Sequence, residues 1–506
     1  MKKRLPLYSF WSWNGKLEES VLSMQIREMK EQGYSGFFMH ARAGLGVGYL
    51  SEEWFRAVDV SLDEAKSCGM EVGIYDENGW PSGFAGGKVV AKNPKLCQKY
   101  LGFTADRSVS GILAGYKRSG KNSWQRCALS EAQLFAHVIE NPAYVDFLEP
   151  KTVSAFIECT HEEYKKRYAA EFGKTIRYVF SDEPQLPQLP WNDRLKEDFA
   201  REYGEDILDG LWRLNEDGAD FDLFLYRYFA LVFRAFRQNY TEKIAAWCAE
   251  NRLEFTGHFA GEDSLTTFNV HGGVQNHYKS MQVPGIDFLG RRLAPAPLVK
   301  QAASVKNQFG KPHVLSESFG CTGWNTTFEE FLYIWNYQAA MGIDFPCLHL
   351  SAYSMKGLRK RDYPSFFSYQ QPWWGKFSEL TRRIKRINGF LQGPSAADVL
   401  VISAETTAQG VRRDGLLSRR IASSYRSLVE GLLAVQVAFD ISNESILNEY
   451  GHIERGALAI GRARYKTVIF SAGLAIRKQT AKLLKRLSAA GINIAFAECL
   501  PTYFVE

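Results

Sequence analysis

Short apolar runs alternate with amphipathic helical stretches through the first three-quarters of the chain. Residues 18–31 show the helical pattern, because Leu22, Ile26 and Met29 recur at i, i+4 and i+7, and Gly33 follows where a helix commonly ends. Strand-like runs are predicted at residues 5–10, 36–40, 71–76, 176–181, 253–258, 285–289, 313–317 and 342–349. This alternation predicts an α/β fold, a (β/α)8 TIM-type barrel, with a doubly wound open sheet as the alternative.

Polar and aromatic side chains gather where these predicted strands end. In chain order they are Trp11, Trp13, Asn14, His40, Arg42, Asp76, Glu77, Trp80, Asp182, Glu183, His258, Asp287, Glu317, His349 and Tyr353. A TIM barrel builds its active site from the C-terminal ends of its strands, so the pattern favours the barrel over the open sheet. We therefore expect these residues to line one mouth.

Two stretches interrupt the regular alternation, and a second unit follows it. Residues 97–144 and 185–233 are predicted to be insertions on the rim of a barrel that spans residues 1–395. Residues 396–506 are predicted to form a smaller α/β domain of flavodoxin or amidotransferase type with a parallel sheet, a domain that could continue beyond the chain given. Its predicted strands are 398–403, 437–441, 467–471 and 492–496, and its predicted helices include 419–433 and 480–490.

Two glutamates carry the strongest chemical signal. Glu183 and Glu317 each end an apolar run, at the fourth and seventh predicted strands, where an unpaired acid is costly to bury. Glycoside hydrolysis needs two carboxyls that face each other, about 5–5.5 Å apart for retention and about 6.5–9.5 Å apart for inversion. Asp182 lies beside Glu183 and could raise its pKa. The alternative is that both glutamates are rim acids paired with basic residues; Arg177, Lys311 and Arg291 are the candidates.

Two further segments are interpreted as sugar-binding subsites. Residues 75–83 (YDENGWPSG) place Asp76 and Glu77 on a Gly/Pro-rich turn that aims Trp80 in a fixed direction. Residues 38–44 place His40 and Arg42 after a strand in a similar way. The alternatives are a buried acid that caps the turn and a histidine that belongs to the core. No nucleotide-binding glycine motif, zinc spacing or G-x-S-x-G elbow is found, whereas calcium held by scattered carboxylates leaves no local signature.

Composition and charge narrow the class of protein. The chain has 506 residues, 45% hydrophobic and 23% charged, with a net charge of +6 and no long basic run, which argues against nucleic-acid and membrane-surface binding. Eight scattered cysteines without a C-x-x-C pair are typical of reduced thiols. No signal-peptide core and no membrane span are recognised, so a cytoplasmic location is predicted, and an oligomer stays open.

Several motifs resemble a known enzyme family. They are residues 10–15 (FWSWNG), 36–45 (GFFMHARAGL), 49–54 (YLSEEW), 73–83 (GIYDENGWPSG), 180–184 (FSDEP), 316–324 (SESFGCTGW), 349–354 (HLSAYS) and 361–364 (RDYP). From about residue 5 to 400 the chain resembles the bacterial α-L-rhamnosidases of glycoside hydrolase family 106 and their uncharacterised relatives. More distantly it resembles family 42 β-galactosidase-like barrels, which also carry an α/β domain after the barrel.

The resemblance implies a (β/α)8 barrel, an inverting mechanism and bound calcium, and it maps the paired glutamates onto Glu183 and Glu317. We therefore expect an exo-acting glycoside hydrolase that cleaves a terminal sugar, with Glu183 as acid. No cofactor is expected to be required, and calcium remains a candidate by resemblance. The alternatives are a retaining β-galactosidase-like hydrolase with Glu317 as nucleophile, and a non-catalytic sugar-binding barrel. Rhamnose lacks a 6-hydroxyl, so Trp11, Trp13, Trp80 or Trp324 could face its methyl group.

Overall fold

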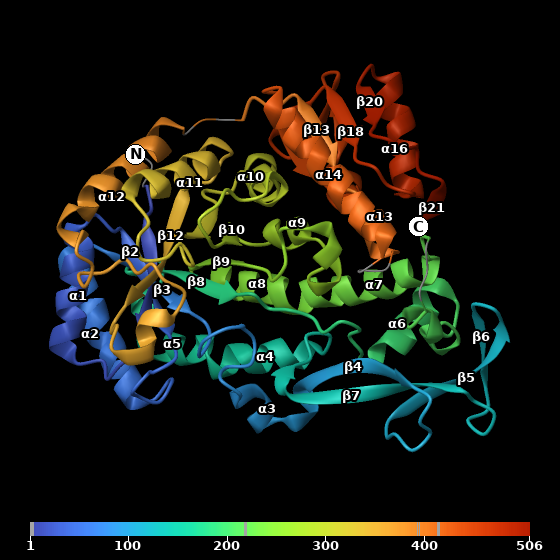
Figure 1. Cartoon of the computed structure of the whole chain (residues 1–506), viewed down its shortest axis with the longest axis horizontal. Coiled ribbons are helices and arrows are strands. Elements are labelled where there is room, and N and C mark those ends of the chain that lie inside the picture. Colours follow the sequence, from blue (N-terminus) through green and yellow to red (C-terminus); the bar gives the residue numbers. More distant parts are fainter. Residues whose placement is uncertain (1–4, 217–219, 392, 394, 412–414, 506) are drawn as a thin grey trace.

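The computed structural model describes residues 5–216, 220–391, 393, 395–411 and 415–505. Its main body is a closed barrel of eight parallel strands in the order β1-β12-β11-β10-β9-β8-β3-β2 (Figure 1). Their bounds are β1 (Tyr8–Trp13), β2 (Gly36–Ala41), β3 (Glu71–Tyr75), β8 (Ile176–Asp182), β9 (Glu254–His258), β10 (Val283–Phe288), β11 (Leu315–Ser318) and β12 (Phe345–Ala352). Each predicted barrel strand is confirmed, with small shifts in its ends, and the open-sheet alternative is wrong.

Alternation along the strands separates the barrel interior from the layer beneath the helices. In β1, Tyr8 and Phe10 point inward, where Phe10 packs edge-on to Phe180 with ring centroids 4.7 Å apart. Trp11 and Trp13 have the opposite parity and pack outward in the cluster that the helices cover. Both faces of the strand are covered, so every residue of β1 is buried, and β1 extends three residues beyond its predicted end.

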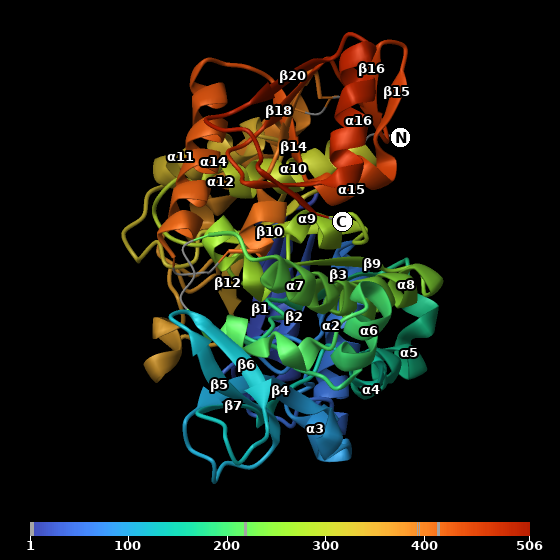
Figure 2. The same cartoon turned by 90° about the vertical axis from the view of Figure 1, so that its right-hand side faces the viewer.

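The helices cover the outside of the barrel (Figure 2). The longer ones are α1 (Glu19–Glu31), α2 (Glu52–Cys68), α4 (Pro150–Cys159), α5 (His161–Tyr168), α7 (Leu223–Phe236), α8 (Lys243–Glu250), α10 (Ala296–Phe309), α11 (Phe328–Ala340) and α12 (Phe377–Phe390), and α9 (Val274–Tyr278) is shorter. Helix α1 buries Leu22, Ile26 and Met29 as predicted, and Gly33 follows it with φ of 88°. A left-handed φ is easily reached only by glycine, which explains the stop.

Both predicted interruptions contain extra structure. The first holds a four-stranded antiparallel sheet in the order β4-β7-β5-β6, formed by β4 (Cys97–Thr104), β5 (Ile112–Gly120), β6 (Ser123–Cys127) and β7 (Leu134–Val145). It follows the short helix α3 (Lys88–Lys92). The second holds α6 (Arg194–Tyr203), two short 3₁₀ turns and the start of α7. It directly follows Glu183 in the chain.

The C-terminal part forms a second parallel sheet in the order β14-β13-β18-β20. Its strands are β13 (Val399–Ile402), β14 (Phe439–Ser442), β18 (Thr467–Phe470) and β20 (Asn493–Phe496), and its helices are α13 (Glu405–Gln409), α14 (Leu416–Ala434), α15 (Glu444–Tyr450) and α16 (Lys478–Ala489). The predicted strands and flavodoxin-like order are present. Small sheets that were not predicted are β15 (His452–Glu454), β16 (Ala457–Ile460) and β17 (Ala463–Tyr465), and β19 (Ala475–Arg477) with β21 (Tyr503–Val505).

This second sheet packs directly on the barrel helices. The N–H of Ile441 donates to Ser304 Oγ on α10 at 2.8 Å, and Gln275 Nε2 of α9 donates to the Ile441 carbonyl at 2.9 Å. Phe439 and Ile441 join the apolar cluster beneath the barrel helices, while the other side of the sheet has a core of its own. The junction therefore combines apolar packing with satisfied backbone groups.

From the sequence, membrane-spanning helices and disulfides are both expected to be absent. In the part of the chain that the structure describes, no helix is long and apolar enough to cross a membrane. Its cysteines are free thiols, of which Cys97, Cys248 and Cys347 are buried and Cys321 is exposed. The cytoplasmic location and the oligomeric state remain predictions.

Candidate active site

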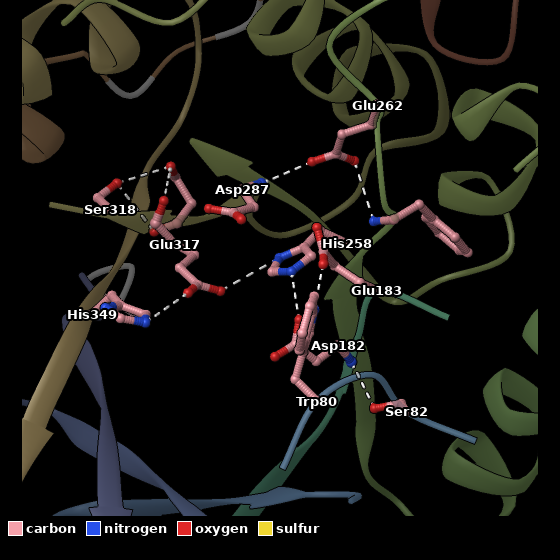
Figure 3. A network of polar contacts seen from close by, with 12 residues as sticks. Trp80, Ser82, Asp182, Glu183, His258, Glu262, Asp287, Glu317, Ser318 and His349 are labelled. Atoms are coloured by element: carbon pink, nitrogen blue, oxygen red, sulfur yellow. Dashed lines mark hydrogen bonds and ion pairs between the residues drawn. The ribbon is translucent and has the colours of Figure 1, made fainter. Parts of the chain in front are cut away.

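The carboxyl ends of the barrel strands bring a compact set of acids and histidines together (Figure 3). Asp182, His258, Asp287, Glu317 and His349 share the inward parity of their strands and stand on β8, β9, β10, β11 and β12. Asp287 and Glu317 are direct neighbours in the register of β10 and β11. Glu183 is the first residue after β8 and has a left-handed φ of 46°, which turns the chain away from the strand direction.

A buried ion pair forms the floor of the site. His258 Nε2 lies 2.8 Å from Asp182 Oδ1, and the Tyr75 hydroxyl donates to Asp182 Oδ2 at 2.5 Å. Burial alone would lower the pKa of His258, but the hydrogen bond and charge of Asp182, with Glu317 and Asp287, hold it well above its usual value. Burial would raise the pKa of Asp182, and its bond to His258 instead holds it below the usual value. His258 is therefore an imidazolium paired with a carboxylate.

Both predicted catalytic glutamates lie close to His258. Glu317 Oε2 lies 3.7 Å from His258 Nδ1. One oxygen of Glu183, one oxygen of Asp287 and a ring nitrogen of His258 lie within 4.8 Å of one another. The two glutamates therefore face the same region of the mouth, as Figure 3 shows.

The two glutamates differ in their surroundings. Burial, with the charge of Asp182, raises the pKa of Glu183, and the Trp80 indole N–H donates to its Oε2. Burial and the charge of Asp287 raise the pKa of Glu317 well above its usual value. Glu317 Oε2 is buried without a hydrogen bond, although the ring of His349 lies 3.7 Å from Oε1. Carboxyls with raised pKa values are typical of acid–base sites.

The rim-acid alternative for these glutamates is wrong, because its candidate partners are engaged elsewhere. Arg177 pairs with Glu254 at 2.9 Å, near the opposite end of the strands. Lys311 donates to the Lys279 carbonyl, and Arg291 pairs with Glu330. None of the three is paired with Glu183 or Glu317.

The turn at residues 75–83 contains two predicted site acids, Asp76 and Glu77, which have different surroundings. Ser82 donates to Asp76 Oδ1 at 2.5 Å, and Asp76 Oδ2 is buried without a hydrogen bond. The Glu77 carboxylate instead accepts backbone N–H bonds from residues 78, 83, 84, 85 and 86. Glu77 is therefore a capping group of the turn, which corrects its prediction as a sugar ligand. Trp80, at the tip, is 54% exposed beside Glu183.

His40 and Arg42 stand on the side of the mouth formed by β2. The ring of His40 stacks on Tyr75 with centroids 3.7 Å apart. Burial, with the charge of Arg42, holds the pKa of His40 well below its usual value, so it is neutral. Arg42 makes a bidentate pair with Asp362 at 2.8 and 2.9 Å, which fixes the long loop after β12 across the mouth. That loop presents Tyr363, 51% exposed, 6.0 Å from the His349 ring.

Three predicted residues do not reach the mouth. Trp13 is fully buried and packs edge-on against Trp54 of α2, because its parity in β1 faces outward. Asn14 is buried and exchanges hydrogen bonds with the backbone of Ser354. Tyr353 accepts from the Glu18 N–H at the start of α1. These three predictions are corrected to structural roles. Trp11 is also buried in the outer layer, so it cannot line a sugar site.

Trp324 stays at the rim. It is 45% exposed and packs edge-on against Phe366 with centroids 5.5 Å apart. With Trp80 and Tyr363 it adds an exposed aromatic side chain near the mouth.

Some residues of the site were missing from the predicted set. Asp287 was recognised at a strand end but was not assigned a role; burial, opposed by His258, raises its pKa to about 7. Glu262 accepts the Asp287 N–H at 2.8 Å, and burial raises its pKa to about 8. The inward parity of β10 could have identified Asp287. Glu262 lies in a loop, where no periodicity marks it.

The described donor groups do not match the ligand set that calcium prefers. Among the described residues, two groups could surround a metal ion, Asp182 with His258 and Glu317, and Glu183 with His258 and Asp287. Both include His258, whose ring is held as an imidazolium, whereas calcium takes six to eight oxygen ligands. Calcium therefore remains only an expectation from family resemblance.

Comparisons with known proteins agree with this fold. The α-L-rhamnosidase model of glycoside hydrolase family 106 matches residues 138–498. A rhamnosidase structure from Novosphingobium sp. PP1Y has a TM-score of 0.72 at 15% identity, over 97% of this chain and 68% of that chain. A family 42 β-galactosidase mutant from G. stearothermophilus has a TM-score of 0.63 at 12% identity, over 97% and 71%.

A β-galactosidase from Rahnella sp. R3 is similar in the same way, with a TM-score of 0.62 at 13% identity, over 98% of this chain and 71% of that chain. A search of curated proteins finds no match. At these identities the structural likenesses establish the fold.

Proposed function

The chain belongs to the α-L-rhamnosidase family of glycoside hydrolases, family 106, and from that premise we propose that it removes a terminal α-L-rhamnose from a glycoside by an inverting mechanism. The observation that carries the proposal is the convergence of Glu183 and Glu317 on His258. They end the fourth and seventh barrel strands, and Glu317 Oε2 lies 3.7 Å from the imidazolium. Two opposed carboxyls are what glycosidic cleavage requires.

Glu183 serves as the general acid in this proposal. Burial and the neighbouring charge of Asp182 raise its pKa, which favours the protonated form that an acid needs. The indole of Trp80 fixes the carboxyl, and Glu183 gives its proton to the leaving oxygen as the glycosidic bond breaks. The left-handed backbone at Glu183 aims the side chain at the mouth.

Glu317 serves as the general base that takes a proton from the attacking water. Its buried Oε2 accepts no hydrogen bond from the described residues, so it can accept that proton. The coupling to Asp287 means that the two carboxyls do not ionise independently, because like charges at close range oppose each other. Burial and the charge of Asp287 raise the pKa of Glu317, so in this proposal the imidazolium of His258, 3.7 Å from Oε2, is the group that favours the ionised form of Glu317.

The mouth also offers groups that could recognise a single terminal sugar. Asp76, His40 and His349 present polar atoms without hydrogen-bond partners, which hydroxyls of a sugar could satisfy. Trp80 and Trp324 are exposed at the rim, and either could face the methyl group of rhamnose. A site with hydrogen-bonding partners for a 6-hydroxyl would discriminate strongly in favour of galactose instead.

A retaining β-galactosidase-like reaction is the second candidate. It is supported by the structural likeness to family 42 β-galactosidases. In that case Glu317 is the nucleophile and Glu183 the acid and base in turn. The family membership favours rhamnoside cleavage over this alternative.

A release assay over nitrophenyl glycosides tests the proposal. We expect release from the α-L-rhamnoside and none from the β-D-galactoside. Release from the galactoside alone would favour the second candidate. No release from any glycoside, together with measurable sugar binding, would favour the non-catalytic sugar-binding barrel.

A further inference from the structure

A cavity of about 300 Å³ lies between the barrel mouth and the second α/β unit. Its barrel side is formed by the loops after β9 and β10, and its other side by α13 and α14, which run alongside these loops in Figure 1. Ligand pockets in proteins begin at about this volume. The cavity is therefore large enough for a sugar residue, and both units contribute to it.

The cavity adjoins the proposed active site through two consecutive acids. Glu262 lines the cavity, and its Oε1 accepts the Asp287 N–H at 2.8 Å (Figure 3). Asp263 also lines the cavity and is close enough for its charge to act on Asp287. Glu262 therefore belongs both to the cavity lining and to the hydrogen-bond network of the proposed active site, so the two lie next to each other.

The lining combines flat apolar surfaces with hydrogen-bonding groups. Phe268, Pro295 and Pro297 supply the apolar surfaces. Glu405, Ser423 and Tyr425 of the second unit supply a carboxylate and two hydroxyls. A sugar ring has the complementary chemistry, because its C–H faces pack on flat apolar groups and its hydroxyls donate to carboxylates.

Two buried polar side chains aim at this cavity. His271 is 4% exposed, lines the cavity, and its Nε2 has no hydrogen-bond partner among the described residues. Glu405 is 9% exposed, and a Cβ at Gly273 would lie 2.5 Å from its Oε2. The Glu405 carboxylate thus reaches across the junction to the barrel. Buried polar groups normally have partners, and a ligand in the cavity would provide one for the ring nitrogen of His271.

A neighbouring cavity differs from this one in volume and in lining. It measures about 70 Å³, and most of its lining is apolar, including Leu189, Phe229 and Val411. It is too small and too apolar for a sugar residue. Of these two neighbouring cavities, only the larger one has both the volume and the acids to hold a sugar residue.

We propose that the larger cavity is the leaving-group subsite and that it binds a sugar residue. On this proposal, which rests on the proposed function, the substrate is an oligosaccharide or glycan, and α13 and α14 recognise the sugar to which the cleaved residue is attached. The second α/β unit then determines specificity for the leaving group.

The test fills the cavity and varies the leaving group. Ser423→Trp places an indole in the cavity from an exposed helix position, and Ser427→Trp, one turn further along α14 and outside the lining, is the matched control. The substrates are α-L-rhamnosyl-(1→6)-D-glucose and α-L-rhamnosyl fluoride, whose leaving group is one atom. We expect Ser423→Trp to lower kcat/KM for the disaccharide by about tenfold or more while leaving the fluoride unchanged. The control should change neither.

An equal loss on both substrates, or a disaccharide value within about twofold of wild type, would overturn the subsite. If the unaltered enzyme cleaves neither substrate, the proposed function fails and the subsite is tested separately. Saturation-transfer NMR with D-glucose, D-galactose and D-glucuronate then reports binding. A signal that Ser423→Trp removes and Ser427→Trp keeps supports the subsite, and no signal from any of the three overturns it.

Discussion

The two ends of the barrel carry similar charged residues and use them in opposite ways. At the N-terminal end, Arg177 lies between Glu254 at 2.9 Å and Glu71 at 3.8 Å. Tyr8 donates to Glu71 at 2.8 Å, and Lys306 pairs with Asp344 at 3.1 Å. Each of these acids therefore has a basic or hydroxyl partner in place.

At the C-terminal end, the acids outnumber the groups that could pair with them. One oxygen each of Asp76, Asp287 and Glu317 is buried and has no hydrogen bond from the described residues, and burial raises the pKa of each of these carboxyls. His258 is shared between several carboxylates, and Arg42 is taken by Asp362. Unpaired buried charge costs stability, so its concentration at one end indicates chemistry, whereas paired charge at the other end indicates structure.

The largest expected effect is on turnover, which substitutions at the C-terminal end of the barrel should lower and a substitution at the N-terminal end should not. Glu183→Gln and Glu317→Gln should each lower turnover by about three orders of magnitude or more, because each removes a proton-transfer role at almost constant volume. Thermal unfolding of both variants should stay near that of the unaltered protein. Glu254→Gln is the matched control at the opposite end and should keep its turnover. Near-normal turnover in either mouth variant would remove that residue from the mechanism.

The second prediction concerns pH. Burial and, second to it, the charge of Asp287 raise the pKa of Glu317, so Asp287→Asn should lower that pKa and leave the base ionised at lower pH. The acid limb of kcat/KM should therefore move to lower pH, by about one unit. The alkaline limb reflects loss of the proton from Glu183, since activity falls as pH rises through its raised pKa. An acid limb that stays in place, or moves upward, would contradict the coupling.

The smallest expected effect is on stability. Arg177→Ala breaks the pairs with Glu254 and Glu71 at the N-terminal end. The side chain is 34% exposed, so we expect a loss of about 1–2 kcal/mol of unfolding free energy, less than for a fully buried pair. Denaturant titration measures it, with turnover of the folded variant unchanged. A stability loss below measurement error would show that these pairs contribute little.

Sequence patterns predicted the barrel well because both faces of its strands are buried and apolar. The same patterns gave wrong roles to individual side chains, because the direction and the partners of one side chain do not follow from the pattern. Trp13 follows a predicted strand end, but β1 continues through it and its parity faces α2. Glu77 looks like a site acid, but its own turn surrounds it with backbone N–H groups.

Contacts across long sequence separations could not be predicted at all. Arg42 meets Asp362, 320 positions later, and Glu262 reaches Asp287 from a loop without periodicity. Such pairs depend on how the barrel closes and on the shapes of its loops. The strand-end acids, in contrast, follow from the strand pattern alone, which is why Glu183, Glu317, Asp182 and His258 were found.

Proton NMR of the sugar first released from an α-L-rhamnoside tests the central claim most directly. If Glu183 and Glu317 act as acid and base across the mouth, the nascent rhamnose is the β anomer, because water attacks from the face opposite the leaving group. The α anomer appearing first would contradict the inverting pair and assign Glu317 as a nucleophile. No release from any glycoside would contradict the account as a whole.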